Sequence, residues 1–298
     1  MYVTLEPCAH LGRTPPCVDA ILEAGIRRCV VALRDPHAIV NGRGVRRLRR
    51  GGVRVEVGLC ADEARSRLAA YLSAHERGRP RVTLKLAVSL DGRLAPPGGF
   101  ARSGRGRWLT GRDARRAAHR MRAASDAVVI GAGTARADDP RLTARVAGVV
   151  RQPLRVVCDT RLRLPRTLRL FRPPLARGTV VACGRRASQT RQRALEALGV
   201  AVWRLPESRE GVSLPALVRR LARAGYHEVM VEGGATLATS LVRDGLADRL
   251  ALFVAPRVLG AGGLPWCGSL NGTPGFRGRW SPPQRFGRDV LCLAEAEA

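Results

Sequence analysis

Short apolar segments alternate with helix-like segments along the chain, and this alternation limits the folds that are open to it. The first part predicts a strand at residues 2–5, a helix at 18–24, a strand at 29–33, then a second helix and a strand at 53–57. This βαβαβ order is typical of parallel strands joined by helical crossovers. The sequence RGRPR at residues 77–81 interrupts the periodicity, and we place a domain boundary there.

The second part opens with a strand at residues 82–88 and continues the alternation. Further strands are expected at 127–130, 154–158, 179–182, 200–204, 228–231 and 249–255. Helices are expected at 111–124, 188–198, 214–224 and 235–244. Both parts are therefore predicted to be α/β, with domains at residues 1–78 and 79–298.

Length and composition narrow the class of protein. A chain of 298 residues with 45% apolar residues is long enough for two globular domains with cores. No run approaches a membrane span, and the first residues lack the order of a secretory signal, so we expect a cytoplasmic protein. The 8 cysteines are scattered, which favours free or metal-bound thiols over a disulfide framework.

The net charge of +28 is high enough to suggest nucleic-acid binding. However, Lys85 is the only lysine among the 52 basic residues, and the arginines are spread over the whole chain. A uniform preference for arginine is typical of coding bias, and 4% aromatic residues offer few surfaces for stacking bases. We expect nonspecific adhesion to nucleic acid at low salt, but no dedicated nucleic-acid partner and no membrane partner.

Two cysteines lie at a predicted strand-to-helix junction, in TLEPCAHLGRTPPC at residues 4–17. Cys8 and Cys17 each follow a proline. The N-terminus of a helix lowers a thiol pKa, and the thiolate is the form that binds zinc. From spacing alone, half of a zinc site and a pair of buried thiols are both open interpretations.

This motif, with residues 35–58 after it, resembles the second zinc motif of the bifunctional riboflavin-biosynthesis deaminase/reductase family. The resemblance implies that residues 1–78 are the C-terminal part of a cytidine-deaminase-like zinc domain of the CMP/dCMP type, with Cys8 and Cys17 as metal ligands. The family's His-Ala-Glu motif, which carries the third ligand and the catalytic glutamate, has no counterpart here. We therefore expect that the chain begins inside that domain and that the zinc site is incomplete. His10 is not expected to replace the missing ligand.

Several motifs of the second part carry chemistry. The stretch IGAGTARADDPRLT at residues 130–143 follows an apolar strand, but two glycines alone are a weak dinucleotide fingerprint. In RWLTG at residues 107–111, Thr110 is expected to cap the following helix. The stretch VMVEGGATL at residues 229–237 leads from a strand through Glu-Gly-Gly into a helix, which directs free N–H groups at a ligand.

From residue 82 onward, these motifs and KLAVSLDG at residues 85–92 resemble the reductase domain of the same family, which has a dihydrofolate-reductase-like fold. The resemblance implies an NADPH site formed by Ala87, Trp108, Thr134, Asp138, Thr160, Gly234, Ala235, Thr236, Leu237, Ala238, Thr239 and Ser240. It implies a substrate site formed by Gly106, Arg122, Leu142, Arg145 and Glu232. Arginine suits the substrate phosphate because its planar guanidinium gives bidentate hydrogen bonds.

The predicted function is the NADPH-dependent reduction of 5-amino-6-(5-phosphoribosylamino)uracil to the ribitylamino product, in riboflavin biosynthesis. The attached deaminase (hydrolase) domain makes the family multifunctional, but no catalytic residue is assigned in this chain. We expect a small-molecule phosphoribosylaminopyrimidine substrate and a homo-oligomer. Two alternatives stay open: a monofunctional reductase with a nonfunctional deaminase remnant, and a basic deaminase directed at nucleic acid.

Overall fold

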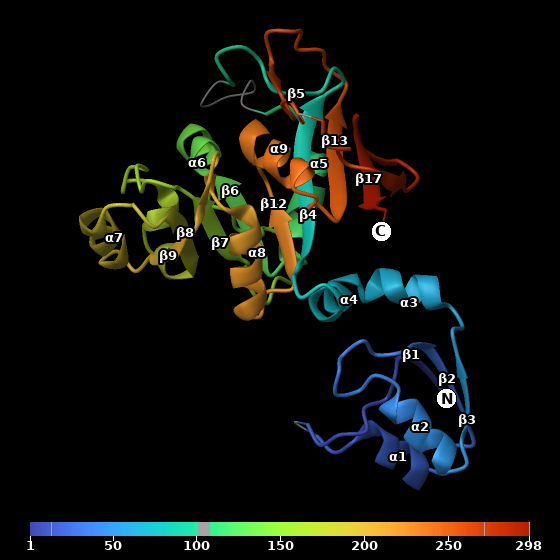
Figure 1. The fold of residues 1–298 in the computed structure, drawn as a ribbon. Coiled ribbons are helices and arrows are strands. Elements are labelled where there is room, and N and C mark those ends of the chain that lie inside the picture. The colour runs from blue at the N-terminus through green and yellow to red at the C-terminus, as the bar shows by residue number, and fades with distance from the viewer. Residues whose placement is uncertain (13, 101–107, 271, 298) are drawn as a thin grey trace. The chain divides into compact units, whose positions relative to one another are not determined.

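The computed structural model describes residues 1–12, 14–100, 108–270 and 272–297. They form two compact units, Met1–Arg79 and Pro80–Ala298. Each unit has its own sheet (Figure 1). Each also has its own apolar core. Among the helices of these residues, none combines the length and the apolar character that a bilayer span requires.

The first unit contains a three-stranded parallel sheet in the order β1-β2-β3. Its elements are β1 (Tyr2–Leu5), α1 (Cys17–Glu23), β2 (Arg28–Leu33), α2 (Arg43–Arg50), β3 (Arg54–Val57), α3 (Ala61–Arg67) and α4 (Ala69–Glu76). The central strand β2 is buried from its second residue onward because it lies between two neighbours. This confirms the predicted βαβαβ order. The helices α3 and α4 were not predicted, since they bury few residues and therefore show no apolar stripe.

The second unit is built on a sheet of ten strands. Its first elements are β4 (Arg81–Ser89), β5 (Arg93–Ala95), α5 (Arg112–Ala123), β6 (Ala127–Gly131), α6 (Ala132–Asp138), β7 (Leu154–Cys158), η2 (Arg169–Phe171), η3 (Ala176–Gly178), β8 (Thr179–Gly184), α7 (Gln189–Glu196) and β9 (Ala201–Leu205). They are followed by β10 (Glu207–Ser208), β11 (Gly211–Val212), α8 (Leu214–Arg223), β12 (Glu228–Val231), α9 (Ala235–Arg243), β13 (Arg249–Ala255), β14 (Leu264–Pro265), β15 (Gly278–Trp280), β16 (Gln284–Phe286) and β17 (Asp289–Ala296).

Seven strands of this sheet run parallel, in the order β13-β4-β12-β6-β7-β8-β9. Their carboxyl ends therefore lie along one edge. The strand β17 adds antiparallel to β13, and the short strands β15 and β16 pair with β17. These last three strands were not predicted, because the residues before β17 are rich in glycine and proline and the pairing with β13 is a long-range event.

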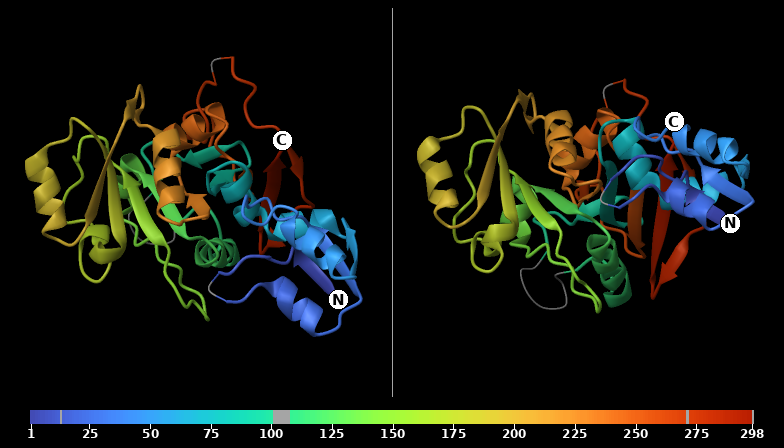
Figure 2. Two further views of the ribbon diagram at one scale, coloured as in Figure 1. Left: turned by 60° about the horizontal axis from the view of Figure 1, so that its bottom comes forward. Right: turned by 90° about the horizontal axis from the view of Figure 1, so that it is seen from below.

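Helices cover both faces of the large sheet (Figure 2). The helices α8 and α9 pack on one face, against the even-numbered residues of β4. The helix α5 packs on the other face, against β13 and β17, and α6 and α7 cover the same face further along the sheet. The odd-numbered residues of β4, which include Lys85 and Ala87, point to the α5 face.

The start of α5 differs from the sequence prediction. The N-cap residue is Gly111, which has no side chain of its own to accept a capping hydrogen bond. Thr110 is buried, and its backbone carbonyl accepts a hydrogen bond from Arg115. The backbone N–H of Gly111 instead donates to the carboxylate of Asp289 at 2.6 Å. A residue distant in sequence thus replaces the predicted Thr110 cap.

Candidate active site

Four loops meet at the carboxyl edge of the large sheet, because the strands β4, β6, β7 and β12 that precede them are parallel. In open parallel sheets, ligands bind in the crevice outside this edge. The reductase motifs of the sequence fall in these loops or just after them. Their side chains come together even though they are far apart along the chain.

An ion pair between Arg122 and Glu232 joins α5 to the end of β12. Arg122 Nε lies 2.5 Å from Glu232 Oε1, and its second nitrogen lies 2.7 Å from Oε2. The two side chains are 14% and 13% exposed. The backbone N–H of Glu232 donates to the carbonyl of Val129, which fixes the start of the loop. Burial by itself raises the pKa of Glu232, but the Arg122 guanidinium outweighs it and lowers the pKa to about 2.

Lys85 lies in the same cluster, and the sequence analysis did not assign it to the site. It projects from β4, with its ammonium 5.5 Å from the ring centroid of Phe253. Loss of water around the ammonium lowers the pKa of Lys85, and the carboxylate of Glu232 opposes that change. The sequence does contain a clue to its role, because Lys85 is the only lysine in a chain that uses arginine at every other basic position. Arginine cannot replace a compact desolvated ammonium without a change in shape.

The segment after α6 contributes Leu142 and Arg145. The Leu142 side chain is buried in the core, and its φ of 51° places the residue in the left-handed region. Only its backbone is therefore available to a ligand. Arg145 is exposed, and its guanidinium lies 3.0 Å from Nε2 of His119 on α5. The carbonyl of Thr143 accepts a hydrogen bond from Arg122 at 3.2 Å, which connects this segment to the ion pair.

The N-terminus of α9 lies against α6. Gly234 is the N-cap residue of α9, and no side chain caps this helix. A Cβ at Gly234 would lie 3.3 Å from the hydroxyl oxygen of Thr134, and one at Gly233 would lie 3.0 Å from Cβ of Leu237. Residues 235–237 form the first turn, whose N–H groups have no partner within the helix. The glycines therefore keep the helix end open to an anion.

The later predicted contacts of α9 are placed differently. Residues 238–240 are buried. The hydroxyl of Thr239 accepts a hydrogen bond from the backbone N–H of Gly268 at 2.8 Å. The hydroxyl of Ser240 donates to the carboxylate of Glu210, which also binds a neighbouring arginine. These two hydroxyls hold loops against α9, so the first turn is the part of the helix that is open to a ligand.

Thr160 follows β7 at the same edge. Its hydroxyl accepts a hydrogen bond from the backbone N–H of Val212 at 3.1 Å. A Cβ at Gly211 would lie 2.6 Å from that hydroxyl oxygen. The hairpin formed by β10 and β11 thus closes directly over Thr160.

Three further predicted residues lie around this edge. Trp108 is 47% exposed, and the guanidinium of Arg115 lies 5.1 Å from the centroid of its ring. Asp138 is exposed at the end of α6, and Ala87 is partly buried on β4. Gly106 lies outside the described residues.

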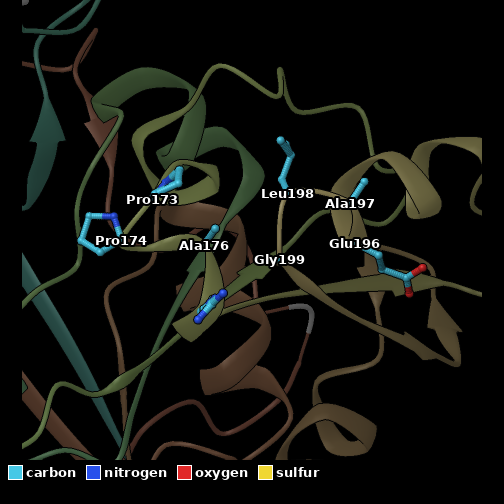
Figure 3. A pocket seen from close by; sticks show the side chains of 8 residues that line it. Pro173, Pro174, Ala176, Glu196, Ala197, Leu198 and Gly199 are labelled. Atoms are coloured by element: carbon cyan, nitrogen blue, oxygen red, sulfur yellow. The ribbon is translucent and has the colours of Figure 1, made fainter.

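A surface pocket on the second unit is unrelated to this site (Figure 3). Its lining residues are Pro173, Pro174, Ala176, Arg177, Glu196, Ala197, Leu198 and Gly199. These residues immediately precede β8 and β9, so the pocket lies at the amino edge of the parallel strands. The predicted reductase residues lie at the opposite edge.

The predicted zinc ligands Cys8 and Cys17 lie together in the first unit. Their sulfur atoms are 3.4 Å apart, and the backbone N–H of Cys17 donates to the sulfur of Cys8 at 3.3 Å. The pKa of Cys17 is raised, chiefly by the hydrogen bond to Cys8, so the expected lowering by the helix N-terminus does not dominate. Within the described ranges, no three His, Cys, Asp or Glu side chains are grouped so that they could hold a metal ion. Glu6 instead accepts hydrogen bonds from backbone N–H groups, including that of Gly42 at 2.8 Å.

Residues 80–277 match the model of the RibD C-terminal domain. The chain belongs to the RibD family. It is 37% identical to the riboflavin biosynthesis protein RibD of Aquifex aeolicus, over 88% of this chain and 70% of that protein. The RibD structure from Acinetobacter baumannii (form 1) superposes with a TM-score of 0.83 at 33% identity, covering 99% of this chain and 80% of that one. A deaminase/reductase structure from Thermotoga maritima has a TM-score of 0.81 at 28% identity, covering 99% and 79%.

Membership of the RibD family confirms three of the sequence predictions: the family, the α/β fold and a pyrimidine reductase of riboflavin biosynthesis. The RibD resemblance also implied zinc and a hydrolase activity. Neither is shown here: the two cysteines lie together, but the described residues around them form no group that could hold a metal ion. The individual RibD site residues and the domain identities stay predictions.

Proposed function

We propose that the second unit catalyses the NADPH-dependent reduction of 5-amino-6-(5-phosphoribosylamino)uracil, which converts its ribosyl group into a ribityl group. The observation that supports this most is the cluster of Lys85, Arg122 and Glu232 beside the open N-terminus of α9. The cluster holds three ionisable groups at the edge where parallel sheets bind ligands. The helix end beside it suits a phosphate.

The cofactor would be held by residues from four segments. The N–H groups at Gly234 and the first turn of α9 would receive a phosphate, with the hydroxyl of Thr134 next to them. Trp108 offers an exposed ring, Thr160 follows β7 at the carboxyl edge, and Asp138 is exposed at the end of α6. When bound, NADPH supplies the hydride. The protein's task is to hold the acceptor carbon beside it and to exclude water.

The substrate would lie over Glu232 and Arg122, with its phosphate toward Arg145. The charge of Arg122 is already compensated by Glu232, whereas Arg145 is exposed and its described partners are uncharged. Arg145 therefore supplies the positive charge for the phosphate and can bind it through two N–H groups.

The reduction also requires a proton. When the ribose ring is opened, hydride adds to C1′ and a proton adds to the attached nitrogen. Glu232 stays ionised near neutral pH because its pKa is about 2, so by itself it accepts hydrogen bonds rather than giving up a proton. Burial lowers the pKa of Lys85, and a lower pKa makes an ammonium a better proton donor. In this proposal Lys85 donates the proton, and Glu232 orients the Lys85 ammonium.

The first unit is proposed to be part of a deaminase domain, residues 1–78, with the reductase at 79–298. In a complete zinc site, Cys8 and Cys17 would be two of the ligands. We derive no deamination step for this chain, because the described residues do not complete that ligand set.

The test is a direct assay of the purified chain. NADPH oxidation is followed by absorbance after addition of the uracil substrate, and the product is identified by a mass increase of two hydrogens. A stoichiometric match between NADPH consumed and ribityl product formed supports the proposal. NADPH that stays unoxidised with this substrate, in a folded chain, overturns it.

A further inference from the structure

The imidazole of His119 contacts Arg145, which lies 26 positions further along the chain. His119 lies on α5, one turn before Arg122. Its Nε2 atom is 3.0 Å from a guanidinium nitrogen of Arg145, and its Nδ1 atom is 3.3 Å from the backbone nitrogen of the same residue. The ring is therefore held between the backbone and the side chain of one arginine.

Only one ring nitrogen of a neutral histidine can accept a hydrogen bond. The guanidinium always donates, and its contact with Nε2 is the shorter of the two. The backbone N–H of Arg145 also points at Nδ1, so two donors of this arginine compete for the single acceptor of the ring. Because the charged guanidinium is the stronger donor, we assign the lone pair to Nε2 and the proton to Nδ1, and the longer backbone contact is then not a hydrogen bond. The ring also forms a hydrogen bond with the backbone of Thr143, which suits an N–H on the side that faces this segment.

The charges around His119 favour the neutral ring. Burial lowers its pKa most, and Arg122 on the same helix and Arg145 on the segment after α6 lower it further. Glu232 after β12 and the hydrogen bond with Thr143 oppose these effects. The resulting pKa is about 4, so the ring is an uncharged acceptor near neutral pH.

A neutral partner has a specific consequence for Arg145. Its described contacts are the ring of His119 and, at 3.5 Å, the hydroxyl of Thr143. A carboxylate would orient the guanidinium equally well, but it would also cancel the charge and repel a phosphate. An imidazole orients Arg145 and leaves its positive charge available. Although the Arg145 side chain is exposed, partial loss of water around its guanidinium and the nearby charges of Arg122 and Arg141 lower its pKa. An anion at this point would relieve that repulsion.

We propose that His119 is a positioning residue for substrate binding: its Nε2 atom accepts a hydrogen bond from Arg145 and directs that guanidinium at the 5-phosphate of the ribosyl group. This inference rests on the proposed function, in which Arg145 binds the phosphate. It deepens that function by naming a residue that acts on substrate affinity through another residue.

Three substitutions separate this role from simple packing. His119→Gln keeps an acceptor oxygen near the place of Nε2. His119→Asn places its oxygen near Nδ1 and does not reach the guanidinium, and His119→Phe keeps the ring shape without an acceptor. His227→Gln is the matched control, because His227 is exposed and precedes β12 at the opposite edge of the sheet.

The first measurement is the affinity of each variant for ribose 5-phosphate, determined by calorimetry, with thermal unfolding as the check on folding. We expect His119→Phe and His119→Asn to bind at least about tenfold more weakly than wild type. His119→Gln and His227→Gln should stay within about threefold of it. Unchanged affinity for ribose 5-phosphate in His119→Phe overturns the inference. Wild-type affinity in His119→Asn together with weak binding in His119→Gln also overturns it, and so does a wild-type chain that does not bind ribose 5-phosphate.

The second measurement is steady-state reduction. In His119→Phe, KM for the phosphorylated substrate should rise about tenfold, while kcat and KM for NADPH stay near wild type. With the substrate that lacks its 5-phosphate, wild type and variant should be alike. A penalty of equal size on both substrates overturns the positioning role. If wild type binds ribose 5-phosphate but does not oxidise NADPH, the proposed reductase function fails and the first measurement still decides the inference.

Discussion

The hydroxyl oxygen of Thr134 lies 3.3 Å from the position that a Cβ would occupy on Gly234. The first residue belongs to α6 and the second caps α9, so the starts of two helices meet at one point of the sheet edge. A ligand phosphate at this point can contact a hydroxyl and several backbone N–H groups together.

A side chain at Gly234 should therefore weaken cofactor binding. The backbone φ of −77° tolerates any residue, so Gly234→Val is expected to fold. We expect KM for NADPH to rise at least about tenfold, which corresponds to about 1.4 kcal/mol of lost binding. Gly234→Ala should have a smaller effect, because it adds only the Cβ. Steady-state kinetics check this, and wild-type values in both variants would show that the turn is merely structural.

Glu232→Gln should affect the substrate and turnover rather than the cofactor. The substitution keeps the shape of the side chain but leaves Arg122 charged in a largely buried position. Removal of one partner of a buried ion pair costs about 3–5 kcal/mol, and we expect less here because the amide oxygen still accepts a hydrogen bond. Denaturant unfolding measures the loss of stability. Fluorescence titration with NADPH should give a dissociation constant near wild type, and a large change in it would contradict the assignment.

Lys85 should not tolerate arginine, although the chain uses arginine almost everywhere else. In Lys85→Arg the larger planar group must fit a desolvated position beside Phe253, and in Lys85→Met the proton is lost. We expect kcat to fall by about 10²-fold or more in both, the usual contribution of a general acid. Circular dichroism should show that Lys85→Met is folded. Wild-type turnover in Lys85→Met would remove Lys85 from the proton transfer.

The low pKa of His119 predicts how stability depends on pH. The folded-state value is about 4, below the ordinary value of 6.5, so between these two pH values the unfolded chain binds a proton that the native chain does not. The contribution of this residue therefore falls as the pH drops from 6.5 towards 4. His119→Gln should show a smaller loss of stability than wild type between pH 7 and pH 5, measured by urea unfolding. Parallel losses in both proteins would contradict the assigned pKa.

Zinc should be bound weakly by this chain. Two thiols without a third ligand forfeit much of the coordination energy. After dialysis against a chelator, metal analysis should find well under one zinc per chain. A tightly held stoichiometric zinc would reveal a further ligand, and His10 is the first to test by substitution with alanine, since Nδ1 of His10 is buried and has no hydrogen-bond partner among the described residues.

Much of the fold could be predicted because it depends on local patterns. The strands β7, β12 and β13 have the bounds that were predicted at 154–158, 228–231 and 249–255, since each lies between two neighbouring strands and is mostly apolar. The Glu-Gly-Gly turn was identified for the same kind of reason: two glycines between a strand and a helix leave the helix end open.

Contacts that join distant segments could not be predicted from the residues alone. Arg122 and Glu232 are 110 positions apart, and nothing in either local sequence indicates a partner among so many arginines. Asp289 replaces Thr110 at the start of α5 because a strand near the C-terminus passes beside that helix. The partners of Thr239 and Ser240 are loops whose course depends on the whole sheet.

The sequence by itself determined the α/β class, the order of most elements and the family resemblance, because periodicity and short motifs are local properties. Only the tertiary structure decided which charges face one another. It placed the single lysine next to Glu232, and it placed the neutral ring of His119 against Arg145. Electrostatic energies depend on distance and on the exclusion of water, and both quantities arise only when the chain is folded.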